Sequence, residues 1–594
     1  MTRPADIVAD YHERTKHHFQ RYARSLGYLD WATQPDPFRR YECAPLVPLR
    51  FRRDDARPAF DDLFTPGAVE AESVTVESIS SLFELSLGLS AWKEFQGSRW
   101  ALRINPSSGN LHPTEGYLVI GSLNGLGECG GVYHYAPMEH ALERRAEFDA
   151  SLWTKMVDSF PKGSFLVGLT SIHWREAWKY GERAYRYCQH DVGHALATVS
   201  ISAAVLGWRS EMLDAIGDAE IALLLGLDRN ADFADAEREH PDLLVAVVPQ
   251  SSEPRTSVRA EAGVSATVAG QMNRITEAAR WYGRANQLSE DHVNWEIIDE
   301  VAEACVRQSD GALRAWSGSD TTDGNGNERE GIRSLPRAAR IDPTTVDPPL
   351  APNRAAVSAA RLIRQRRSAV AFDGHTSITA EQFYFMLDRT LPRFDRVPWN
   401  TLGPPACVHL GLFVHLVEGV PPGLYCLVRS PAQTDSLRSA MSASFAWEKP
   451  PSCPEGLPLF LLQRGDARRV STQVSCGQEI AGESAFSLGM IAEFERPLRE
   501  YGAWFYRRLF WECGVIGQVL YLEAEAASVR GTGIGCFFDD PVHDVLGLTG
   551  RAYQSLYHFT VGGPIEDLRL TTLPPYPREL VANRAAASDD IAHR

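Results

Sequence analysis

Two stretches of the chain repeat one pattern: AWKYGERAYRYCQHDVG occupies residues 177–193, and REYGAWFYRRLFWECG occupies residues 499–514. Five pairs of positions keep one constant offset in residue number between the two stretches. The pairs are Lys179 with Glu500, Tyr180 with Tyr501, Tyr185 with Tyr506, Arg186 with Arg507, and Gly193 with Gly514. The order of the expected helices and strands around them also repeats, which predicts an internal duplication. Two copies of a domain that pairs with itself would form a single-chain pseudo-dimer.

The bulk properties are those of a multi-domain globular protein. The chain has 594 residues, with 44% hydrophobic and 10% aromatic content, which suits two to four domains. The net charge of -16 argues against a nucleic-acid partner, because an acidic surface repels phosphate. We expect no membrane span and no N-terminal targeting segment. The ten cysteines include no CxxC pair, so we expect reduced thiols in a cytoplasmic protein.

Periodicity and composition divide the chain into five expected segments. They are an N-terminal helical and extended segment at 1–75, a first half at 76–255, a helical connector and flexible linker at 256–354, a second half at 355–580 and a tail at 581–594. The first segment is expected to hold a helix over 5–26, and 265–316 to be helical. The apolar run LPLFLLQRG of the second half is matched to SFLVGLTSI of the first, which leaves residues 468–486 without a counterpart.

Three motifs offer groups for a flat, phosphorylated ligand. RINPSSGNLHPTEGY (103–117) is expected to be a loop with several short hydrogen-bonding side chains. RQRRSAVAF (364–372) ends an expected helix with clustered arginines that can bind a phosphate. GTGIGCFFDD (531–540) has glycines that let a ligand approach the backbone. Taken singly, each also suits a structural role: a polar turn, a solvated basic helix end and a tight turn.

Together, in a duplicated chain, these motifs resemble the nitroreductase-like flavoprotein superfamily. The segments WKYGERAYRY and GTGIGCFFDDPVHDVLGL resemble its SagB-type branch, the azoline dehydrogenases of thiazole and oxazole peptide pathways. The resemblance covers roughly residues 76–250 and 355–575. It implies an α+β fold of two nitroreductase-like α/β/α halves with mixed, mostly antiparallel sheets, which pack as an intramolecular pseudo-dimer. It also implies FMN as the cofactor, bound between the halves.

The resemblance places the parts of one complete FMN site on both halves. The residues that it assigns to cofactor binding are Arg103, Pro106, Ser107, Ser108 and Asn110 in the first half, and Arg366, Arg367, Ser368, Gly533, Ile534, Gly535 and Arg569 in the second. The second half lacks the Ser-Ser-Gly-Asn string, and the first half lacks a clear Arg-Arg-Ser cluster. A second site assembled from these remaining parts would therefore be degraded.

The resemblance assigns catalysis to Lys179 and Tyr180, because a Lys-Tyr pair is required for oxidation in the azoline dehydrogenases. Oxidation of an azoline removes a hydride, which FMN would accept, and a proton, which needs a base; oxygen would then reoxidise the flavin. A lysine is normally protonated at neutral pH, so Lys179 would need burial or cationic neighbours. Arg175, Arg183 and Arg186 are candidates for such neighbours.

Two other functions stay open: an NAD(P)H-dependent reductase of nitro groups, quinones or enones, and a non-catalytic scaffold that binds a peptide. The substrate class is a small molecule or a modified peptide, biosynthetic pathway proteins are candidate partners, and the oligomeric state is open. His190 and His194 have a spacing that can bind zinc, but without an HExxH motif we expect core histidines and no metal. We expect Glu182 and Asp191 to form helix ion pairs.

Overall fold

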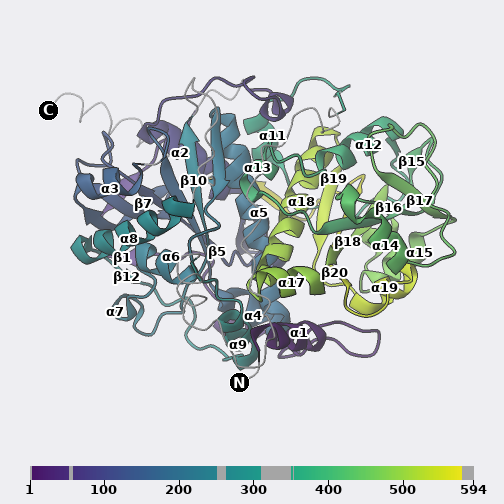
Figure 1. The fold of residues 1–594 in the computed structure, drawn as a ribbon, viewed down its shortest axis with the longest axis horizontal. Helices are drawn as coiled ribbons and strands as arrows, with labels where there is room; N and C mark the ends of the chain where they lie inside the picture. Colours follow the sequence, from purple (N-terminus) through teal and green to yellow (C-terminus); the bar gives the residue numbers. More distant parts are fainter. Residues whose placement is uncertain are drawn as a thin grey trace, which may run out of the picture.

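The computed structural model describes residues 3–52, 58–158, 160–249, 262–309, 350–351 and 353–577. They form two halves that lie side by side, the first purple to teal and the second green to yellow (Figure 1). The linker expected at 317–331 and the tail expected at 581–594 lie outside the described residues. Across the described ranges, no helix is both long and apolar enough to cross a membrane.

The first half is built on an antiparallel sheet with the strand order β11-β7-β6-β5-β8-β10-β9, and β2 also pairs with β7. Its strands are β2 (Leu46–Pro48), β5 (Thr114–Ile120), β6 (Gly130–Ala136), β7 (Ala141–Phe148), β8 (Phe165–Ser171), β9 (Trp208–Met212), β10 (His240–Pro249) and β11 (Arg280–Trp281). Every residue of β5, β6 and β8 is buried, so both faces of the sheet must be covered.

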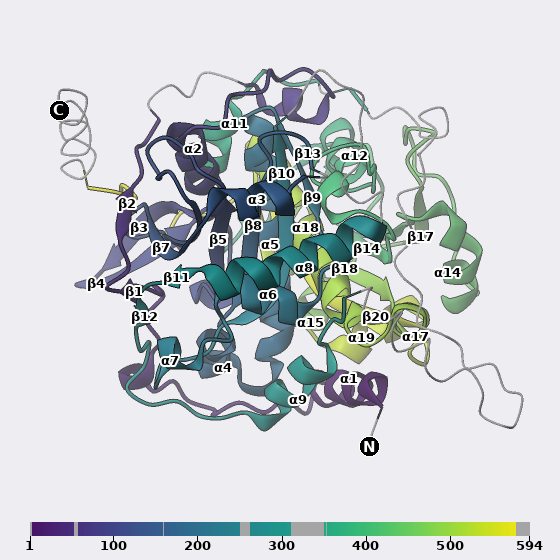
Figure 2. The ribbon, with the colours of Figure 1, turned by 60° about the vertical axis from the view of Figure 1, so that its left-hand side comes forward.

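Helices cover this sheet and join its strands. They are α2 (Val76–Leu87), α3 (Ala150–Met156), α4 (His173–Tyr180), α5 (Ala184–Val205), α6 (Asp218–Leu225), α7 (Asn230–Phe233), α8 (Ala262–Ala278) and α9 (Glu296–Ala304). Figure 2 shows α3, α6 and α8 along the outer side of the first half. The expected helical connector is therefore two helices separated by β11 and β12 (Arg284–Ala285).

The second half has an antiparallel sheet with the order β17-β16-β14-β18-β20-β19. Its strands are β14 (Val408–Val414), β16 (Gly423–Leu427), β17 (Leu459–Arg464), β18 (Phe486–Glu493), β19 (Arg530–Ile534) and β20 (Tyr553–Gly562). Its helices are α11 (Ala359–Gln365), α12 (Ala380–Arg389), α13 (Trp399–Leu402), α14 (Thr434–Ala440), α15 (Arg468–Val474), α16 (Glu479–Gly482), α17 (Glu495–Tyr501), α18 (Phe505–Ala526) and α19 (Asp539–Leu546). The order of its six strands matches β7-β6-β5-β8-β10-β9 of the first half.

This shared order corrects one strand match made from the sequence. By their places in the sheets, β17 corresponds to β7, and β18 corresponds to β8. The match of LPLFLLQRG to SFLVGLTSI was therefore wrong. Residues 468–486 lie between β17 and β18, where the first half has α3 between β7 and β8. The error arose because β17 and β18 are both apolar runs, and an apolar run does not reveal its place in a sheet.

The two longest helices, α5 and α18, cross in the centre of the molecule (Figure 1). Both have 22 residues, and all but one of those in α5 are buried. Gly193 and Gly514 face each other at the crossing: a Cβ built on Gly514 would lie 2.7 Å from the Cα of Gly193. Glycine at both positions lets the two backbones touch. Trp511 Nε1 also donates to Gln189 Oε1 across the crossing, at 2.7 Å.

Reciprocal ion pairs join the halves on either side of this crossing. Arg186 of α5 pairs with Asp539 at the start of α19, at 2.7 Å. Arg507 of α18 pairs with Asp218 at the start of α6, at 2.8 Å. The two arginines, and likewise the two aspartates, are separated by the same offset as the repeated phrase. The contact between the halves is therefore made twice by equivalent residues.

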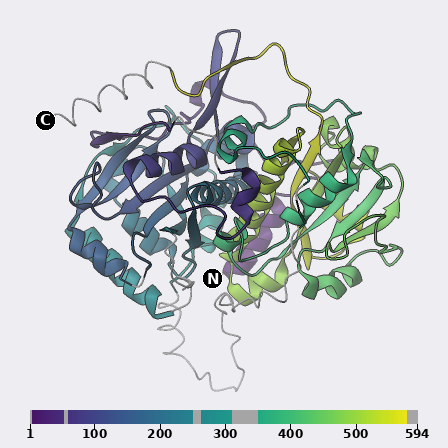
Figure 3. The same ribbon diagram turned by 90° about the horizontal axis from the view of Figure 1, so that it is seen from above.

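Segments from the ends of the chain extend over the opposite half. Strand β21 (Thr571–Leu573) pairs with β3 (Leu89–Phe95) of the β3–β4 hairpin, whose second strand is Ser98–Arg103. Figure 3 shows the yellow C-terminal segment running from the second half to this hairpin. At the other end, α1 (Pro4–Arg14) places His12 against Tyr506.

Helix α1 is shorter than the expected helix over 5–26. It ends at Arg14, and the hydroxyl of Thr15 donates to the carbonyl of Tyr11. Phe19 and Tyr22 fall within the expected range but lie beyond the end of α1, and both are mostly exposed. Their rings contact Phe538 of the second half, so a tertiary contact rather than a helix accounts for their spacing.

Two further pairs of short strands complete the fold. Strand β1 (Tyr41–Glu42) pairs with β12 near the first sheet. Strand β13 (Ile378–Thr379) pairs with β15 (Val417–Glu418) in parallel. The main sheets are antiparallel throughout the described strands, which agrees with the expected mostly antiparallel α/β/α halves.

Candidate functional site

A break between two helices positions Lys179 and Tyr180. Helix α4 ends at Tyr180, and Gly181 takes a φ of 54°. A Cβ there would collide with the backbone of Arg24 and Ser25, so only glycine fits. The second copy of the phrase breaks in the same way, between α17 and α18 at Gly502.

The end of α4 lies against the Pro-Ser-Ser loop between β4 and β5. A Cβ built on Gly109 would lie 2.6 Å from Tyr180 Oη and 3.2 Å from Lys179 Nζ. Lys179 and Tyr180 are half-buried, and Gly109 is exposed. The structure therefore brings together the two predicted catalytic residues and the predicted flavin-contacting loop.

The polar side chains of this loop hold its shape. Ser107 Oγ accepts from the backbone N–H of His112 at 3.0 Å, and Asn110 Nδ2 donates to the carbonyl of Ala101 at 2.8 Å. Pro106 is half-buried beside them. The structure thus assigns Ser107 and Asn110 to shaping the loop, a role that spacing alone could not distinguish from ligand binding.

A buried carboxyl pair lies behind the loop. Asp191 of α5 accepts from the N–H of Ser108 at 3.0 Å and from its Oγ at 3.2 Å. Burial raises the pKa of Asp191 well above its usual value. Burial, and next the nearby Asp191, raise the pKa of Glu176 in the same direction. The pair therefore retains a proton at pH values where a solvated carboxyl would be ionised.

The two expected helix ion pairs do not form as predicted. Asp191 makes no ion pair among the described residues. Glu182 does form an ion pair, with Arg14 Nε at 3.0 Å, but that partner belongs to α1 and not to its own helix. Asp191 was misread because its partner, Ser108, is distant in sequence.

The cationic neighbours expected for Lys179 are neutralised elsewhere. Arg175 pairs with Glu115, and Arg183 and Arg186 both pair with Asp539. The titratable side chain that interacts with Lys179 is instead the carboxyl of Glu176. The expectation failed because proximity in sequence did not reveal these distant carboxylates.

The arginine cluster begins where α11 ends. Arg366 is buried, and its Nη2 donates to the carbonyl of Arg103, at 3.2 Å, in the first half. Arg367 Nη2 donates to the carbonyl of Ser90, also in the first half, at 2.8 Å. Ser368 is exposed, and its Oγ lies 2.9 Å from Tyr521 Oη. The cluster therefore lies at the contact between the halves.

Within the part of the chain that the structure describes, the guanidinium groups of Arg366 and Arg367 form no ion pair with a carboxylate. The acidic influence on both is Glu525, whose carboxyl also contacts the backbone N–H of Arg367. Burial lowers the pKa of Arg366, and it lowers that of Arg367 to about 10. The carboxyl of Glu525 attracts both guanidinium groups without forming an ion pair, and this attraction is weaker than the effect of burial. A buried cation without a counter-ion is costly, so the cluster suits a phosphate.

Arg103 contributes in a different way. Its side chain is buried and donates to the carbonyl of Thr114 at 3.4 Å and to that of Pro37. Burial lowers its pKa to about 10. Its backbone carbonyl is what contacts Arg366. Arg103 therefore connects the loop of the first half to the arginine cluster of the second.

The glycine-rich segment begins in strand β19, which includes Gly531 and Gly533, and Gly535 directly follows the strand, so its glycines do not form the tight turn suggested in isolation. A Cβ on Gly533 would strike the ring of Tyr557, and one on Gly535 would strike the ring of Tyr187 at 2.4 Å. Packing of aromatic rings therefore explains both glycines. Ile534 points into a small apolar cluster.

Hydrogen bonds tie β19 to the rest of the site. The N–H of Gly533 donates to Tyr521 Oη at 2.9 Å, beside Ser368. Tyr187 of the first half donates to the carbonyl of Gly535 at 3.1 Å. The segment thus runs from the arginine cluster toward α5 and the end of α4.

Arg569 is the one predicted site residue with no described contact to this group. It is mostly exposed and pairs with Asp567 at 2.7 Å. Its guanidinium lies 5.9 Å from the ring centre of Phe95, on the β3–β4 hairpin. The resemblance selected Arg569 by its late position in the sequence, and that position lies on the C-terminal segment.

The histidines are core residues, as expected. His190 Nε2 contacts the carbonyl of Leu556 at 3.0 Å, and His194 Nε2 contacts Tyr557 Oη at 3.2 Å. Burial lowers the pKa of His194 to about 3. Within the described residues, no cluster of His, Cys, Asp or Glu could hold a metal ion.

Several site residues escaped sequence reasoning. Tyr521 and Tyr557 came from elements without a polar motif, and Tyr187, the last residue of the quoted segment WKYGERAYRY, was given no role. Only the fold brings these three rings to β19 and the residue that follows it. Glu176 lies three residues before Lys179 on α4, a helical spacing that could have drawn attention to it. Asn105, beside the Pro-Ser-Ser loop, is 1% exposed, and both polar atoms of its amide lack a partner among the described residues.

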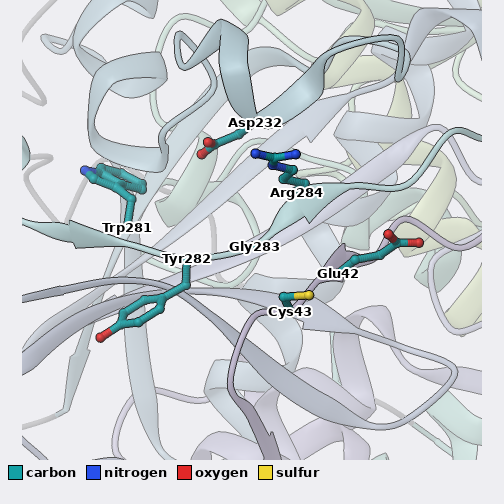
Figure 4. A pocket seen from close by; sticks show the side chains of 7 residues that line it. All are labelled: Glu42, Cys43, Asp232, Trp281, Tyr282, Gly283 and Arg284. Carbon is teal, nitrogen blue, oxygen red and sulfur yellow. The ribbon is translucent and has the colours of Figure 1, made fainter.

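A separate cavity of about 450 Å³ lies in the first half. Glu42, Cys43, Asp232, Tyr282 and Arg284 are among its lining residues (Figure 4). None of the predicted site residues lines it. We place the candidate site at the contact between the halves, because charge and motif geometry converge there and not at this cavity.

Comparison with known proteins supports the fold. Residues 68–236 match the model of the Nitroreductase family. A solved structure of "a putative nitroreductase" from Anabaena variabilis shares the fold with a TM-score of 0.61 at 20% identity, and the match covers 94% of this chain and 99% of that one. The match therefore spans both halves of this chain, and one solved chain has the same overall fold.

Two curated relatives match shorter parts. "Putative nitroreductase MJ1384" of Methanocaldococcus jannaschii is 28% identical over 148 residues, which are 24% of this chain and 68% of that protein. The "Trifolitoxin-processing protein TfxB" of Rhizobium leguminosarum bv. trifolii is 32% identical over 131 residues, which are 21% of this chain and 35% of that protein. Residues 68–236 are thus similar to the Nitroreductase family, within a chain whose α+β fold is nitroreductase-like.

Proposed function

We propose that the chain is an FMN-dependent oxidoreductase that oxidises an azoline-like ring in a peptide or small natural-product intermediate. The observation that carries the proposal is that Arg366 and Arg367, at the contact between the halves, form no ion pair among the described residues and have only the weaker attraction of Glu525 to offset their burial. The phosphate of FMN would supply the missing anion, and the exposed hydroxyl of Ser368 could donate to it. The Pro-Ser-Ser loop and α4 would then border the flavin ring.

The residues fit FMN in three respects. The buried Arg366 and the half-buried Arg367 suit an anion, the amide of Asn105 offers unused donors and an acceptor, and the exposed Gly109 and Ser368 leave polar backbone and side-chain groups accessible. FMN bound there would supply a two-electron acceptor whose electrons pass to oxygen. One relative is named a trifolitoxin-processing protein, which supports a peptide substrate and biosynthetic partners for this chain.

The side chains at the end of α4 would manage the proton. Oxidation of an azoline to an azole removes a hydride and a proton. Lys179 is half-buried, and a substrate and flavin bound against it would complete its desolvation, which favours the neutral amine; its Nζ would then be the base that takes the proton. Burial, and next Glu176, raise the pKa of Tyr180 well above its usual value. Tyr180 therefore remains a neutral phenol that can donate a hydrogen bond to the substrate.

We also propose that the two halves arose by duplication. The common strand order, the facing glycines and the reciprocal ion pairs, which share the offset of the repeated phrase, support this origin. A duplicated dimer begins with two equivalent sites. Here Glu500, the counterpart of Lys179, is paired with Arg496 at 3.0 Å, so we expect one FMN per chain.

The test compares two variants related by the repeat, Lys179→Ala and Glu500→Ala. The wild type should carry one FMN per chain and convert a thiazoline peptide to the thiazole, detected as the loss of two hydrogens by mass spectrometry. Both variants should retain FMN, and only Lys179→Ala should lose at least about 100-fold in rate.

Three results would reject the proposal. Full activity of Lys179→Ala would remove the proposed base. Failure to bind FMN would favour a scaffold. Rapid reduction of the flavin by NAD(P)H, without azoline oxidation, would assign a reductase of nitro groups, quinones or enones instead.

A further inference from the structure

Two cysteines from different elements meet beside the glycine-rich segment. Cys476 follows α15, and Cys536 lies between β19 and α19. Their sulfur atoms are 2.8 Å apart, and both side chains are partly exposed. Both are free thiols in the structure. A disulfide bond has a length of about 2.05 Å, so the sulfurs need to approach by less than about 1 Å to form one.

Independent contacts hold the two cysteines together. Gln478 Nε2 donates to the carbonyl of Cys536 and to that of Ser475, both at 2.9 Å. Ser475 Oγ is in turn 3.3 Å from Nδ1 of His558, on β20. The turn that carries Cys476 is thus tied to the segment that carries Cys536, whatever the state of the sulfurs.

The charges around the pair distinguish its members. The hydrogen bond with Cys476, and next the guanidinium of Arg183, lower the pKa of Cys536. The same contact raises the pKa of Cys476. Burial and Asp539 oppose the shift at Cys536 but do not reverse it. Cys536 is therefore the better nucleophile, and Cys476 is the thiol that can resolve a mixed disulfide.

We propose that Cys476 and Cys536 are a reversible redox modification site that exchanges with a small-molecule disulfide such as oxidised glutathione. The thiolate of Cys536 attacks one sulfur of that disulfide, which breaks its S–S bond, forms a mixed disulfide and releases one thiolate. Cys476 loses its proton and attacks the Cys536 sulfur, which releases the second thiolate. The two thiols of the protein are thereby oxidised to one disulfide, with the loss of two hydrogens. The small disulfide is reduced to two thiols.

The bridge would join residues 468–486 covalently to the glycine-rich segment. Cys536 directly follows Gly535, whose carbonyl accepts from Tyr187 at 3.1 Å and from Arg183 at 3.4 Å. Oxidation would therefore fix the end of β19 that faces the first half. The proposal goes beyond the flavin chemistry and does not depend on it.

The test is peptide mapping of the full chain after equilibration in reduced or oxidised glutathione. In the oxidised buffer we expect one cross-linked peptide pair containing Cys476 and Cys536, which dithiothreitol reverses. The variant Cys476→Ser should stop at a mixed disulfide on Cys536. The variant Cys129→Ser is the matched control, since it removes another partly exposed thiol, and it should form the bridge normally.

Alkylation rates provide a second readout. Because thiolates are the reactive form and the contact between the two thiols lowers the pKa of Cys536 and raises that of Cys476, Cys536 in the reduced wild type should be alkylated at least about tenfold faster than Cys476 at neutral pH. Oxidised samples in which both cysteines remain fully alkylatable would overturn the proposal. So would a bridge that forms at other cysteines while this pair stays reduced.

Discussion

The crossing of α5 and α18 makes a quantitative prediction about Gly514. In the variant Gly514→Ala, the new methyl carbon would lie 2.7 Å from both Gly193 Cα and His194 N, and nearer still to the carbonyl of His190. All three are backbone atoms, so no side-chain rotation relieves the overlap. The nearest contact, to the carbonyl oxygen of His190, is 2.2 Å and ordinary contact begins at 3.4 Å, so relieving it requires a local separation of about 1.2 Å.

The expected cost follows from two opposing effects. Alanine in a helix interior is about 1 kcal/mol more favourable than glycine. Overpacking of a rigid core costs about 1–3 kcal/mol, and the upper end applies because α5 is buried on nearly all sides. Separation also weakens the dispersion contacts along both helices. We therefore expect a net destabilisation of about 2 kcal/mol.

Gly270→Ala is the matched control. Gly270 lies in α8, is exposed, and a Cβ there would meet no atom within 4 Å. This variant should gain about 1 kcal/mol, which is the propensity difference alone. The midpoint of urea unfolding, followed by circular dichroism and by tryptophan fluorescence, should fall for Gly514→Ala and rise for Gly270→Ala. A Gly514→Ala protein as stable as the wild type would refute the backbone contact at the crossing.

Three other changes test the charges and hydroxyls of the interface. Asp539→Asn leaves two buried arginines unpaired and should cost about 3–5 kcal/mol of unfolding free energy, measured by urea denaturation. Burial raises the pKa of Asp242 to about 6, so its ionisation lowers the stability of the native state as pH rises from 4 to 7. The variant Asp242→Asn lacks this ionisation. Its unfolding free energy should therefore gain about 3 kcal/mol relative to the wild type across that range. Equal pH profiles for the two proteins would contradict this. Tyr521→Phe removes the hydroxyl shared by Ser368 and Gly533, and equilibrium dialysis should find FMN binding weakened about fivefold to tenfold; unchanged affinity would separate this hydroxyl from the phosphate site.

The sequence was informative where the signal was local or repeated. The constant offset of the repeated phrase indicated two equivalent helices, which are α5 and α18. The strands β5, β8 and β10 are each apolar runs in the sequence. The loop at 106–110 and the end of α11 were also where their turn residues and arginines predicted. These features depend on periodicity and on turn chemistry, which a single sequence contains.

Several errors involve partners that are distant in the chain. Arg183 was expected to act on Lys179, but it pairs with Asp539, which is 356 residues away. The sequence also could not show that the rings of Tyr557 and Tyr187 lie beside Gly533 and Gly535. Such pairings depend on how the two halves pack, and no local pattern specifies them.

The asymmetry between the two copies is clearest at the carboxyl on the central helix. Asp191 and Glu512, its counterpart at the offset of the repeat, both accept from the backbone N–H of the segment that leads into β5 or β14. Glu512 is balanced by Arg429, with which it forms a buried ion pair. In the first half, no arginine or lysine forms an ion pair with Asp191 among the described residues, and Glu176 brings a second carboxyl.

Pro497 stands where the second half would need its equivalent of Glu176. One copy therefore compensates its buried carboxylate, and the other leaves a proton-sharing pair next to Lys179 and the Pro-Ser-Ser loop. A merely structural carboxylate gains nothing from a second acid beside it, because each raises the cost of ionising the other. A perturbed pair of this kind is characteristic of functional sites. The acid pair in the first half thus supports, independently of any motif, the active site that we propose on that side of the crossing.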